Sequence, residues 1–343
     1  MPPSILSDSL TSLTLPSALP PEALQVLDAA GRPLQEHTQP SLLPITSDPL
    51  GVTERSLPNI GGYLIGSRIG TGGTSWVYEG ADPSTGRPVA VKVQRVRSGW
   101  ADTAGTILQN EAAILGHLRH PNVLPLLAAG QLPDGRRWLA FPLMAGGDLH
   151  SQQLQLAAGR DLKRWPLRRR LASFLSVCAA VEHAHSMGVI HRDLKPRNVM
   201  FDDEGFVQLA DWGLAGPPTQ PPPRDQPSPS TAGTPGYMAP EQISPRLGPV
   251  DARSDVWSLG AVLYEAITLR RAIAGKTITE RMVETLAGRS PDPRTHAPQV
   301  PDALALACRR ALERAPEDRF ATVLDLAIAV GAALGSLPPT RRQ

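Results

Sequence analysis

The spacing of apolar residues divides the chain into two structured regions with a flanking segment at each end. Residues 1–60 are rich in Pro, Ser, Leu and Thr and are expected to be mostly disordered. From residue 61 to about 141 apolar and polar positions alternate as in strands, with one helical interruption. From about 146 to 337 the apolar residues recur at helical spacing. The pattern predicts an α+β fold with a small β-rich lobe and a larger helical lobe, joined by a hinge at about 142–145 and followed by a short tail at 338–343.

The strand expected at RPVAVKVQRV places its valines and its lysine on opposite faces. Val89, Val91 and Val93 share one face, and Ala90 and Lys92 share the other. Lys92 therefore points away from the apolar face. It enters a site beside this strand or, as an ordinary edge-strand lysine, points into solvent.

The helix expected at TILQNEAAILGHL carries a carboxylate within its apolar stripe. Glu111 lies one turn after Ile107 and one turn before Leu115. Because a carboxylate that faces a core is costly unless a cation meets it, Lys92 of the same lobe is the expected partner. The alternative is a glutamate that reaches out to solvent at the edge of the helix.

A hairpin is expected in the helical lobe, where two short strands flank the turn-forming cluster DDEG. The strands are Val199–Phe201 and Phe206–Leu209. An antiparallel hairpin brings its outer ends together, so Asn198 and Asp211 are expected at the same open end. Their amide and carboxylate oxygens would form a hard oxygen site suited to Mg²⁺ that carries phosphates.

Charge and composition bear on the class of protein. A formal net charge of +2 over 343 residues gives no electrostatic case for binding nucleic acid or a membrane surface. The N-terminus lacks the charged region of a secretory signal, and the apolar stretch FATVLDLAIAVGAALG is too short for a membrane span and carries Asp325. A cytoplasmic protein without a membrane span is therefore expected. Cys178 and Cys308 lie in helix-like apolar patterns and are expected to be buried free thiols.

A glycine-rich stretch, IGTGGTSWVYEG, precedes the strand of Lys92. It resembles the phosphate-binding pattern G-x-G-x-x-G, but Ser75 stands where the third glycine would be. Taken alone, the stretch fits a working nucleotide clamp, a relic of one or an ordinary turn. Only four of the 34 basic residues are lysine, so lysine is expected where a compact point charge is needed.

An ordered set of motifs carries a resemblance to a known family. HRDLKPRN matches the protein-kinase catalytic loop H-R-D-L-x-x-x-N in every fixed position, DWG resembles D-F-G, and GTPGYMAPE resembles the A-P-E region. Together with the glycine loop, VAVK and Glu111, these motifs follow the family order over residues 63–335. The chain resembles the eukaryotic-like (Hanks-type) serine/threonine protein kinases of bacteria, which implies a bilobal kinase fold. Serine/threonine preference is implied by Lys195 and Thr234.

The resemblance implies a role for each matching residue. Asp193 would accept the proton of the substrate hydroxyl, and Lys195 would offset charge on the transferred phosphoryl group. Asn198 and Asp211 would hold Mg²⁺, with Mn²⁺ as a second possibility, and Lys92 would anchor the ATP phosphates. The glycine loop is then interpreted as a working clamp. The implied ATP-binding residues are Ile69, Gly70, Thr71, Gly72, Gly73, Ser75, Val77, Ala90, Lys92, Glu111, Phe141, Leu143 and Met144.

Other matches imply structural and regulatory roles. Asp255 resembles the residue that holds the catalytic loop, and Glu241 and Arg319 resemble a buried ion pair that supports the substrate-binding segment. Arg192 resembles the arginine that pairs with a phosphorylated loop residue, for which Ser228, Ser230 and Thr231 are candidates. The proline-rich segment 216–233 is interpreted as a stiffened activation loop, with a docking strip for SH3- or WW-like modules as the alternative.

The expected function is an ATP-dependent serine/threonine protein kinase that acts on protein hydroxyls and is able to phosphorylate itself. Two other classes stay open. The first is a pseudokinase that binds nucleotide as a scaffold, against which the complete set of Lys92, Asp193, Asn198 and Asp211 argues. The second is a small-molecule phosphotransferase of the antibiotic- or choline-kinase kind, which lacks the A-P-E segment that this chain has.

Overall fold

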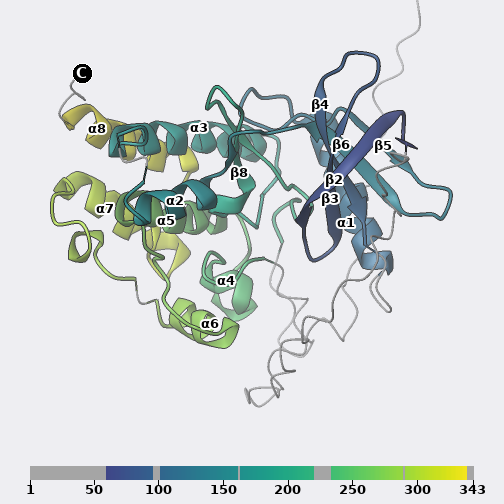
Figure 1. The fold of residues 1–343 in the computed structure, drawn as a ribbon. Helices are drawn as coiled ribbons and strands as arrows, with labels where there is room; N and C mark the ends of the chain where they lie inside the picture. The colour runs from purple at the N-terminus through teal and green to yellow at the C-terminus, as the bar shows by residue number, and fades with distance from the viewer. Residues whose placement is uncertain (1–58, 96–100, 161–162, 220–232, 289, 338–343) are drawn as a thin grey trace, which may run out of the picture.

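The architecture has two lobes, as Figure 1 shows. The computed structural model describes residues 59–95, 101–160, 163–219, 233–288 and 290–337. Strands with one helix form the smaller N-lobe, and mostly helices form the larger C-lobe, which confirms the predicted α+β class. The expectations for residues 1–58 and for the tail 338–343 lie outside the described residues.

The N-lobe is built on one antiparallel sheet with the strand order β1-β2-β3-β4-β6-β5. The valine face of β4 is buried, since Val89, Val91 and Val93 are at most 1% exposed, and it packs with Tyr78 and Trp138. Lys92 projects from the other face. The strands are β1 Asn59–Ile60, β2 Tyr63–Thr71, β3 Ser75–Ala81, β4 Pro88–Gln94, β5 Ala128–Gln131 and β6 Arg137–Pro142.

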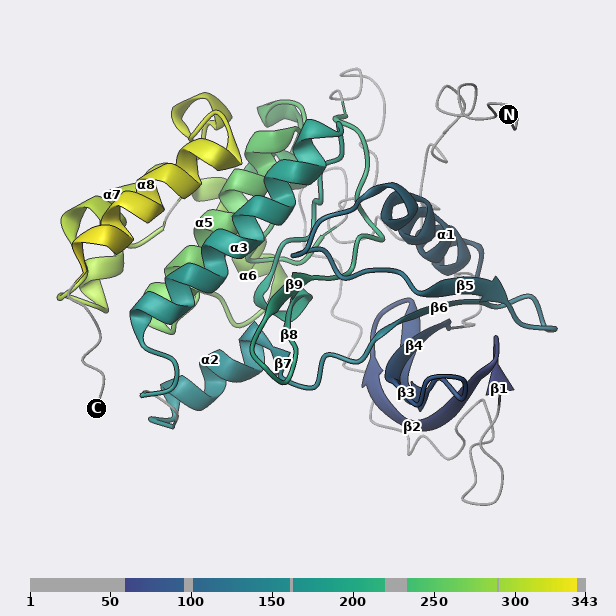
Figure 2. The same cartoon turned by 90° about the horizontal axis from the view of Figure 1, so that it is seen from above.

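Helix α1, Ala101–His117, lies along one side of this sheet and contacts β4 and β6 (Figure 2). Its most buried line runs through Ala104, Leu108, Glu111 and Leu115, at a spacing of three and four residues. Ile107 is only half-buried, so the expected stripe is rotated by about one residue. Glu111 stays within the buried line.

The hinge leads from β6 to a second, three-stranded antiparallel sheet, β7-β8-β9, with β7 at Gly147–Asp148, β8 at Val199–Phe201 and β9 at Val207–Leu209. Gly146 is needed at this junction, because a β-carbon there would lie 2.2 Å from the carbonyl oxygen of Asp202. The end of the hinge is therefore packed against the turn that follows β8.

The C-lobe core surrounds α5, of which 14 of 17 residues are buried. Helices α3, α7 and α8 pack against it. Cys178 and Cys308 lie in this core as free thiols, and burial raises the pKa of both. The helices are α2 Leu149–Ala157, α3 Leu167–Ser186, α4 Pro240–Ile243, α5 Ala252–Thr268, α6 Ile278–Ala287, α7 Asp302–Ala311 and α8 Val323–Ser336, with 3₁₀ turns at Pro196–Asn198, Pro245–Leu247, Pro293–Thr295 and Pro316–Asp318.

The last helix explains the apolar C-terminal stretch. Asp325 forms a capping box with Thr322 at the start of α8, so its carboxylate binds backbone and hydroxyl groups at the helix end. Leu326 and Val330 are fully buried against the rest of the lobe. Across the part of the chain that the structure describes, no helix has the length and apolar content needed to span a membrane.

Candidate active site

Lys92 joins the two lobes through a pair of carboxylates. Its Nζ lies 2.7 Å from Glu111 Oε2 and 2.8 Å from Asp211 Oδ1, so strand β4, helix α1 and the segment after β9 meet at one cation. Burial opposes the charge of Lys92, but the two carboxylates outweigh it and raise the lysine pKa. Burial raises the pKa of Glu111, which Lys92 partly offsets. Lys92 instead holds the pKa of Asp211 at about 2, so the pair stays charged.

The β8–β9 hairpin brings Asn198 and Asp211 to its open end. Val199 pairs with Leu209, and the amide of Ala210 donates to the carbonyl of Asn198 at 2.8 Å. Asp211 takes a left-handed φ of 64°, which turns its side chain out of the strand direction.

These two side chains fit a magnesium ion. The amide nitrogen of Asn198 donates to the Asp193 carbonyl at 2.8 Å, which leaves its amide oxygen available. Asp211 uses Oδ1 for Lys92, and its second oxygen accepts no hydrogen bond from the described residues. An amide oxygen and a carboxylate oxygen are the ligand types that Mg²⁺ takes alongside phosphates and water.

Asp193 is held between two donors. The Thr234 hydroxyl donates to Asp193 Oδ1 at 2.6 Å, and the Lys195 ammonium donates to Asp193 Oδ2 and, at 2.9 Å, to the Thr234 oxygen. Asp193 is only 7% exposed. The arrangement fixes the carboxylate with one edge toward Lys195, as proton transfer from a positioned hydroxyl requires.

Asp255 of α5 holds the loop that carries Asp193 through hydrogen bonds to its backbone. The fully buried Asp255 carboxylate accepts the backbone amides of His191 at 2.8 Å and Arg192 at 2.9 Å, and it lies 2.7 Å from His185 Nε2. Burial acts to raise the pKa of Asp255, but these donors lower it on balance. Arg192 has a left-handed φ of 67°, a conformation that these bonds maintain.

Trp212 replaces the phenylalanine of D-F-G at a packing position. Its side chain is fully buried, and its indole lies 4.5 Å from the His191 ring, measured between centroids. The indole N–H donates to the Leu209 carbonyl at 3.2 Å. The larger ring is therefore accommodated with its polar atom bonded.

Arg192 reaches the start of the proline-rich segment 216–233, where its guanidinium donates to the carbonyl of Pro217. Burial lowers the pKa of this arginine. The candidate phosphorylation sites Ser228, Ser230 and Thr231 lie outside the described residues, as does most of the segment 216–233.

Glu241 and Arg319 form a bidentate ion pair in the C-lobe. Both side chains are fully buried, and both N···O distances are 2.8 Å. The remaining donors of Arg319 go to the carbonyls of Arg253, Glu313 and Arg314. Glu241 follows the APE proline, so the pair ties the end of that segment to the region before α8.

The glycine loop is closed by its own backbone. The Gly72 amide donates to the Ser75 carbonyl at 2.8 Å, and Ser75 is 3% exposed and opposite Gln94 in the β3–β4 register. The third glycine is thus replaced where β3 begins rather than at the loop tip, and a small side chain fits there.

The other residues expected to bind ATP lie on the N-lobe strands, in the glycine loop and in the hinge. Val77 stands opposite Lys92, and Ala90 stands opposite Phe141, whose strand leads into the hinge. Ile69 is 49% exposed on β2, whereas Met144 is 8% exposed within the hinge. The remaining positions, Gly70, Thr71, Gly73 and Leu143, lie in β2, the loop and the hinge.

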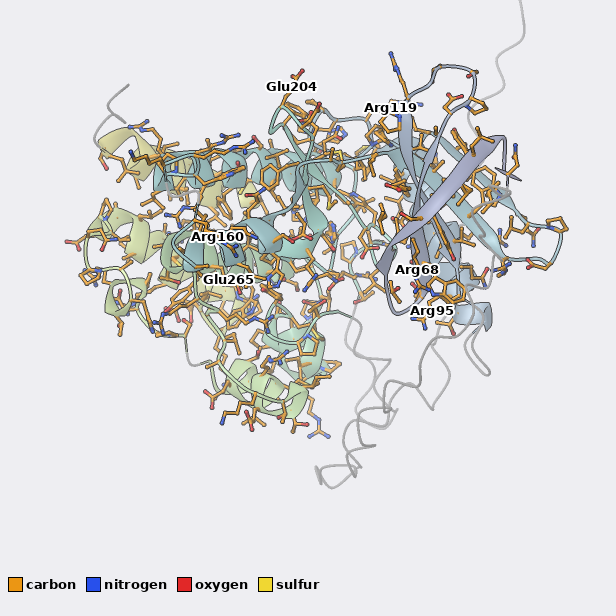
Figure 3. The ribbon with its side chains drawn as sticks, in the orientation of Figure 1. Arg68, Arg95, Arg119, Arg160, Glu204 and Glu265 are labelled. Carbon is orange, nitrogen blue, oxygen red and sulfur yellow. The ribbon has the colours of Figure 1, made fainter. Side chains whose placement is uncertain are left out.

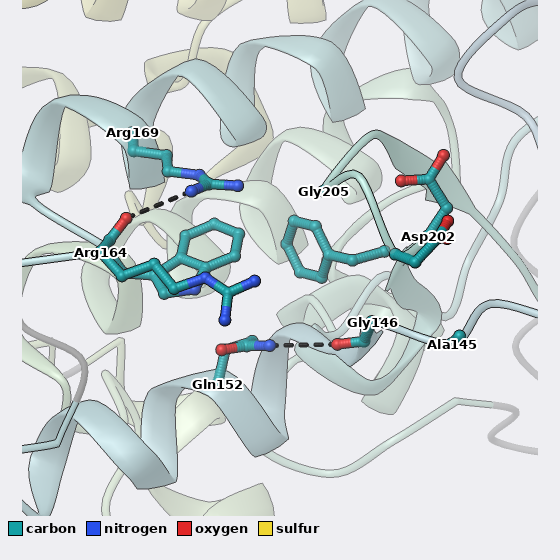
Figure 4. Close-up of a pocket in the computed structure, with 10 residues that line it drawn as sticks. Ala145, Gly146, Gln152, Arg164, Arg169, Asp202 and Gly205 are labelled. Carbon is teal, nitrogen blue, oxygen red and sulfur yellow. Dashed lines mark hydrogen bonds between the residues drawn. The ribbon is translucent and has the colours of Figure 1, made fainter.

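A separate cavity of about 330 Å³ lies beyond the hinge (Figure 4). Figure 4 shows two arginines on one side of it and Asp202 on the other. It contains none of the residues expected to bind ATP or metal, so it is distinct from the candidate active site. Its lining includes Ala145, Gly146, Gln152, Arg164, Arg169 and Asp202.

Two contacts were not expected from the sequence. Asn110 donates to the carbonyls of Gly213 at 3.0 Å and Ala215 at 2.9 Å, which connects α1 to the segment after Asp211. His185 of α3 pairs with Asp255 of α5. No local pattern indicates either partner, because each contact joins residues far apart in the chain.

Comparison with known proteins agrees with this geometry. Residues 63–326 match the family described as protein kinase domain. The chain is 38% identical over 247 residues to the DNA damage-responsive serine/threonine-protein kinase RqkA of Deinococcus radiodurans, a match that covers 71% of this chain and 35% of that protein. It is 32% identical over 281 residues to the serine/threonine-protein kinase PknH of Mycobacterium tuberculosis, covering 80% of this chain and 42% of that protein.

The serine/threonine-protein kinase PknE of Mycobacterium tuberculosis is 31% identical over 283 residues, covering 82% of this chain and 48% of that relative. The chain thus spans less than half the length of these curated relatives. The family match covers most of the chain and includes both lobes. This chain therefore belongs to the protein kinase family and is similar to bacterial serine/threonine kinases of the Hanks type.

Proposed function

We propose that this chain is an ATP-dependent serine/threonine protein kinase that transfers the γ-phosphoryl group of ATP to protein hydroxyls. The supporting observation is that two groups of polar side chains lie on either side of Asn198. Asp193, Lys195 and Thr234 form one, and Lys92 with Asp211 belongs to the other. Asn198 lies between them, since it follows the same loop and its amide donates to the Asp193 carbonyl.

Each residue has a distinct task in the proposed reaction. Bound MgATP supplies the phosphoryl group, with ADP as the leaving group. Asp193 orients the substrate hydroxyl and takes its proton, while the hydroxyl oxygen forms the new P–O bond and the bond to ADP breaks. Lys195 offsets negative charge on the transferred group, and Thr234 holds the side chains of Asp193 and Lys195 in position through hydrogen bonds to both.

Nucleotide and metal are proposed to bind between the lobes. Lys92 holds the α/β-phosphates while Glu111 keeps its ammonium in place, and Asn198 and Asp211 hold Mg²⁺, with Mn²⁺ as the second candidate. Because ATP is a cytoplasmic reactant, we propose that the domain acts in the cytoplasm.

The proposed partners are proteins that carry accessible serine or threonine. The chain itself is the first candidate, through Ser228, Ser230 and Thr231 in the segment 216–233. The same segment contains PTQP, which fits the P-x-x-P pattern of SH3 ligands. Mass mapping before and after incubation with ATP tests the modification sites.

The direct test compares the parent protein with Asp193→Asn, using labelled ATP, Mg²⁺ and a generic basic protein. Transfer by the parent and its loss in the variant, with ATP binding retained in both, is the expected result. ATP binding without transfer by the parent would favour the pseudokinase. Transfer to kanamycin or choline but to no protein would favour the small-molecule phosphotransferase.

A further inference from the structure

Arg95, directly after β4, contacts the glycine loop in two ways. Its backbone amide donates to the Thr74 carbonyl at 2.9 Å, and its Nη1 donates to the Gly72 carbonyl at 2.8 Å. The guanidinium also lies over the Trp76 ring, 5.2 Å from the ring centroid. Figure 3 shows Arg95 at the same end of the N-lobe sheet as Arg68 of β2.

The strand register shows from which side Arg95 holds the loop. Trp76 stands opposite Val93, so both lie on the valine face, whereas Val77 stands opposite Lys92 on the other face. Arg95 continues the alternation of the valines. Its guanidinium therefore holds the Gly72 carbonyl from the face opposite to Lys92.

Because the peptide bond is planar, the contact of Arg95 with the Gly72 carbonyl also sets the direction of the Gly73 amide. In a planar trans peptide the C=O of one residue and the N–H of the next point in opposite directions. When the Gly72 carbonyl turns toward Arg95, the Gly73 amide turns toward the face of Lys92. The Gly72 amide is already used by the Ser75 carbonyl, and the Gly73 amide makes no hydrogen bond with the described residues. The Gly73 N–H is thus a free donor on the side where phosphates are expected.

We propose that Arg95 is a positioning residue, which orients the Gly72–Gly73 peptide so that the Gly73 amide binds a phosphate of ATP. The proposal rests on the proposed kinase function. It also explains how a loop with Ser75 at the third glycine position keeps a defined shape, since Arg95 fastens the loop at Gly72 and Thr74. Glycine at 72 and 73 would otherwise leave the peptide free to rotate.

The test is Arg95→Ala, with ATP affinity and kinetics measured at saturating protein substrate. We expect the KM and Kd for ATP to rise about five- to ten-fold, while kcat stays within about two-fold, because only binding through the loop is weakened. Trp76→Leu, which removes the platform under the guanidinium, should shift both constants in the same direction. In the double variant, the loss of ATP-binding free energy should be smaller than the sum of the losses in the two single variants.

Two further variants separate orientation from charge and from folding. Arg87→Ala removes the same charge from an exposed position at the other end of the β3–β4 hairpin, and it should leave the KM for ATP unchanged. Arg95→Lys keeps the charge but not the planar stacked group, so the KM should stay at least about three-fold raised. Full restoration by lysine would overturn the positioning role.

Hydrogen exchange of the peptide 70–76, measured without nucleotide, gives a readout independent of activity. Faster exchange in Arg95→Ala than in Arg87→Ala, at equal melting temperature, supports the proposal even if the parent transfers no phosphate. Unchanged exchange and unchanged ATP affinity in Arg95→Ala, in a parent that binds ATP and transfers phosphate, overturns the proposal and leaves the kinase function intact.

Discussion

Replacement of Arg319 by methionine tests how the C-lobe holds the end of the GTPGYMAPE sequence. All five guanidinium N–H groups of Arg319 are used, two by Glu241 and three by backbone carbonyls. Methionine has similar length, so the loss reports the ion pair and these hydrogen bonds rather than a large cavity. It leaves the Glu241 carboxylate with no cation in a fully buried site.

The expected loss follows from that uncompensated charge. Removing one partner of a buried pair costs about 3–5 kcal/mol, which lowers the melting temperature by roughly 6–20 °C for a domain of this size. The double variant Glu241→Gln/Arg319→Met should recover part of the loss, because no buried charge is left without a partner.

The measurement is thermal and urea unfolding of the parent, the two single variants and the double variant. Arg309→Ala is the matched control, since Arg309 is exposed and its nearest carboxylate, Asp292, is 3.8 Å away. We expect this control to lose less than about 0.5 kcal/mol. A loss below about 1 kcal/mol for Arg319→Met, or a double variant as unstable as the sum of both singles, would refute the reasoning.

Three further predictions concern the candidate active site. Glu111→Gln should lower kcat/KM about 10- to 100-fold, because Lys92 loses one of two charged partners, and steady-state kinetics measures it. Thr234→Ala should lower kcat about ten-fold or more with the KM for ATP nearly unchanged, whereas Thr234→Ser should restore it; an unchanged kcat in the alanine variant would contradict the bridge to Asp193. Because the pKa of Asp211 falls from 3.8 to about 2 on folding, its contribution to stability is complete above pH 4 and is lost as the pH falls through about 2. Between pH 5 and pH 2 the free energy of unfolding should fall less steeply for Asp211→Asn than for the parent. An identical pH dependence in the two proteins would exclude this role of Asp211.

Local patterns predicted the elements that carry the chemistry. The alternation around Lys92 and the turn between Val199 and Leu209 each follow from neighbouring residues, so the face of the lysine and the open end of the hairpin could be expected. The prediction of which side of α1 is buried was less accurate. Ile107 and Leu108 are both apolar, and only packing against the sheet decides which of them is buried.

Long-range polar contacts could not be predicted from local sequence patterns. Arg95 follows a strand as many arginines do, and nothing in its neighbourhood indicates that its guanidinium reaches Gly72. Asn110 and His185 bind groups 103 and 70 positions away, respectively, at Gly213 and Asp255. Only the assembled lobes bring these groups within hydrogen-bond distance.

The left-handed backbone at Arg192 and Asp211 links folding energy to the shape of the active site. A non-glycine residue in this region costs about 1–3 kcal/mol, a cost that the free chain avoids by adopting negative φ. The folded structure therefore has to hold both residues in this conformation. It holds Arg192 through the hydrogen bond of its amide to Asp255, and Asp211 through its ion pair with Lys92. Glycine at either position would release the stored strain, but it would also remove a functional side chain and, at position 211, the ion pair with Lys92. The backbone strain at these two positions is thus a cost in folding free energy that comes with the shape of the active site.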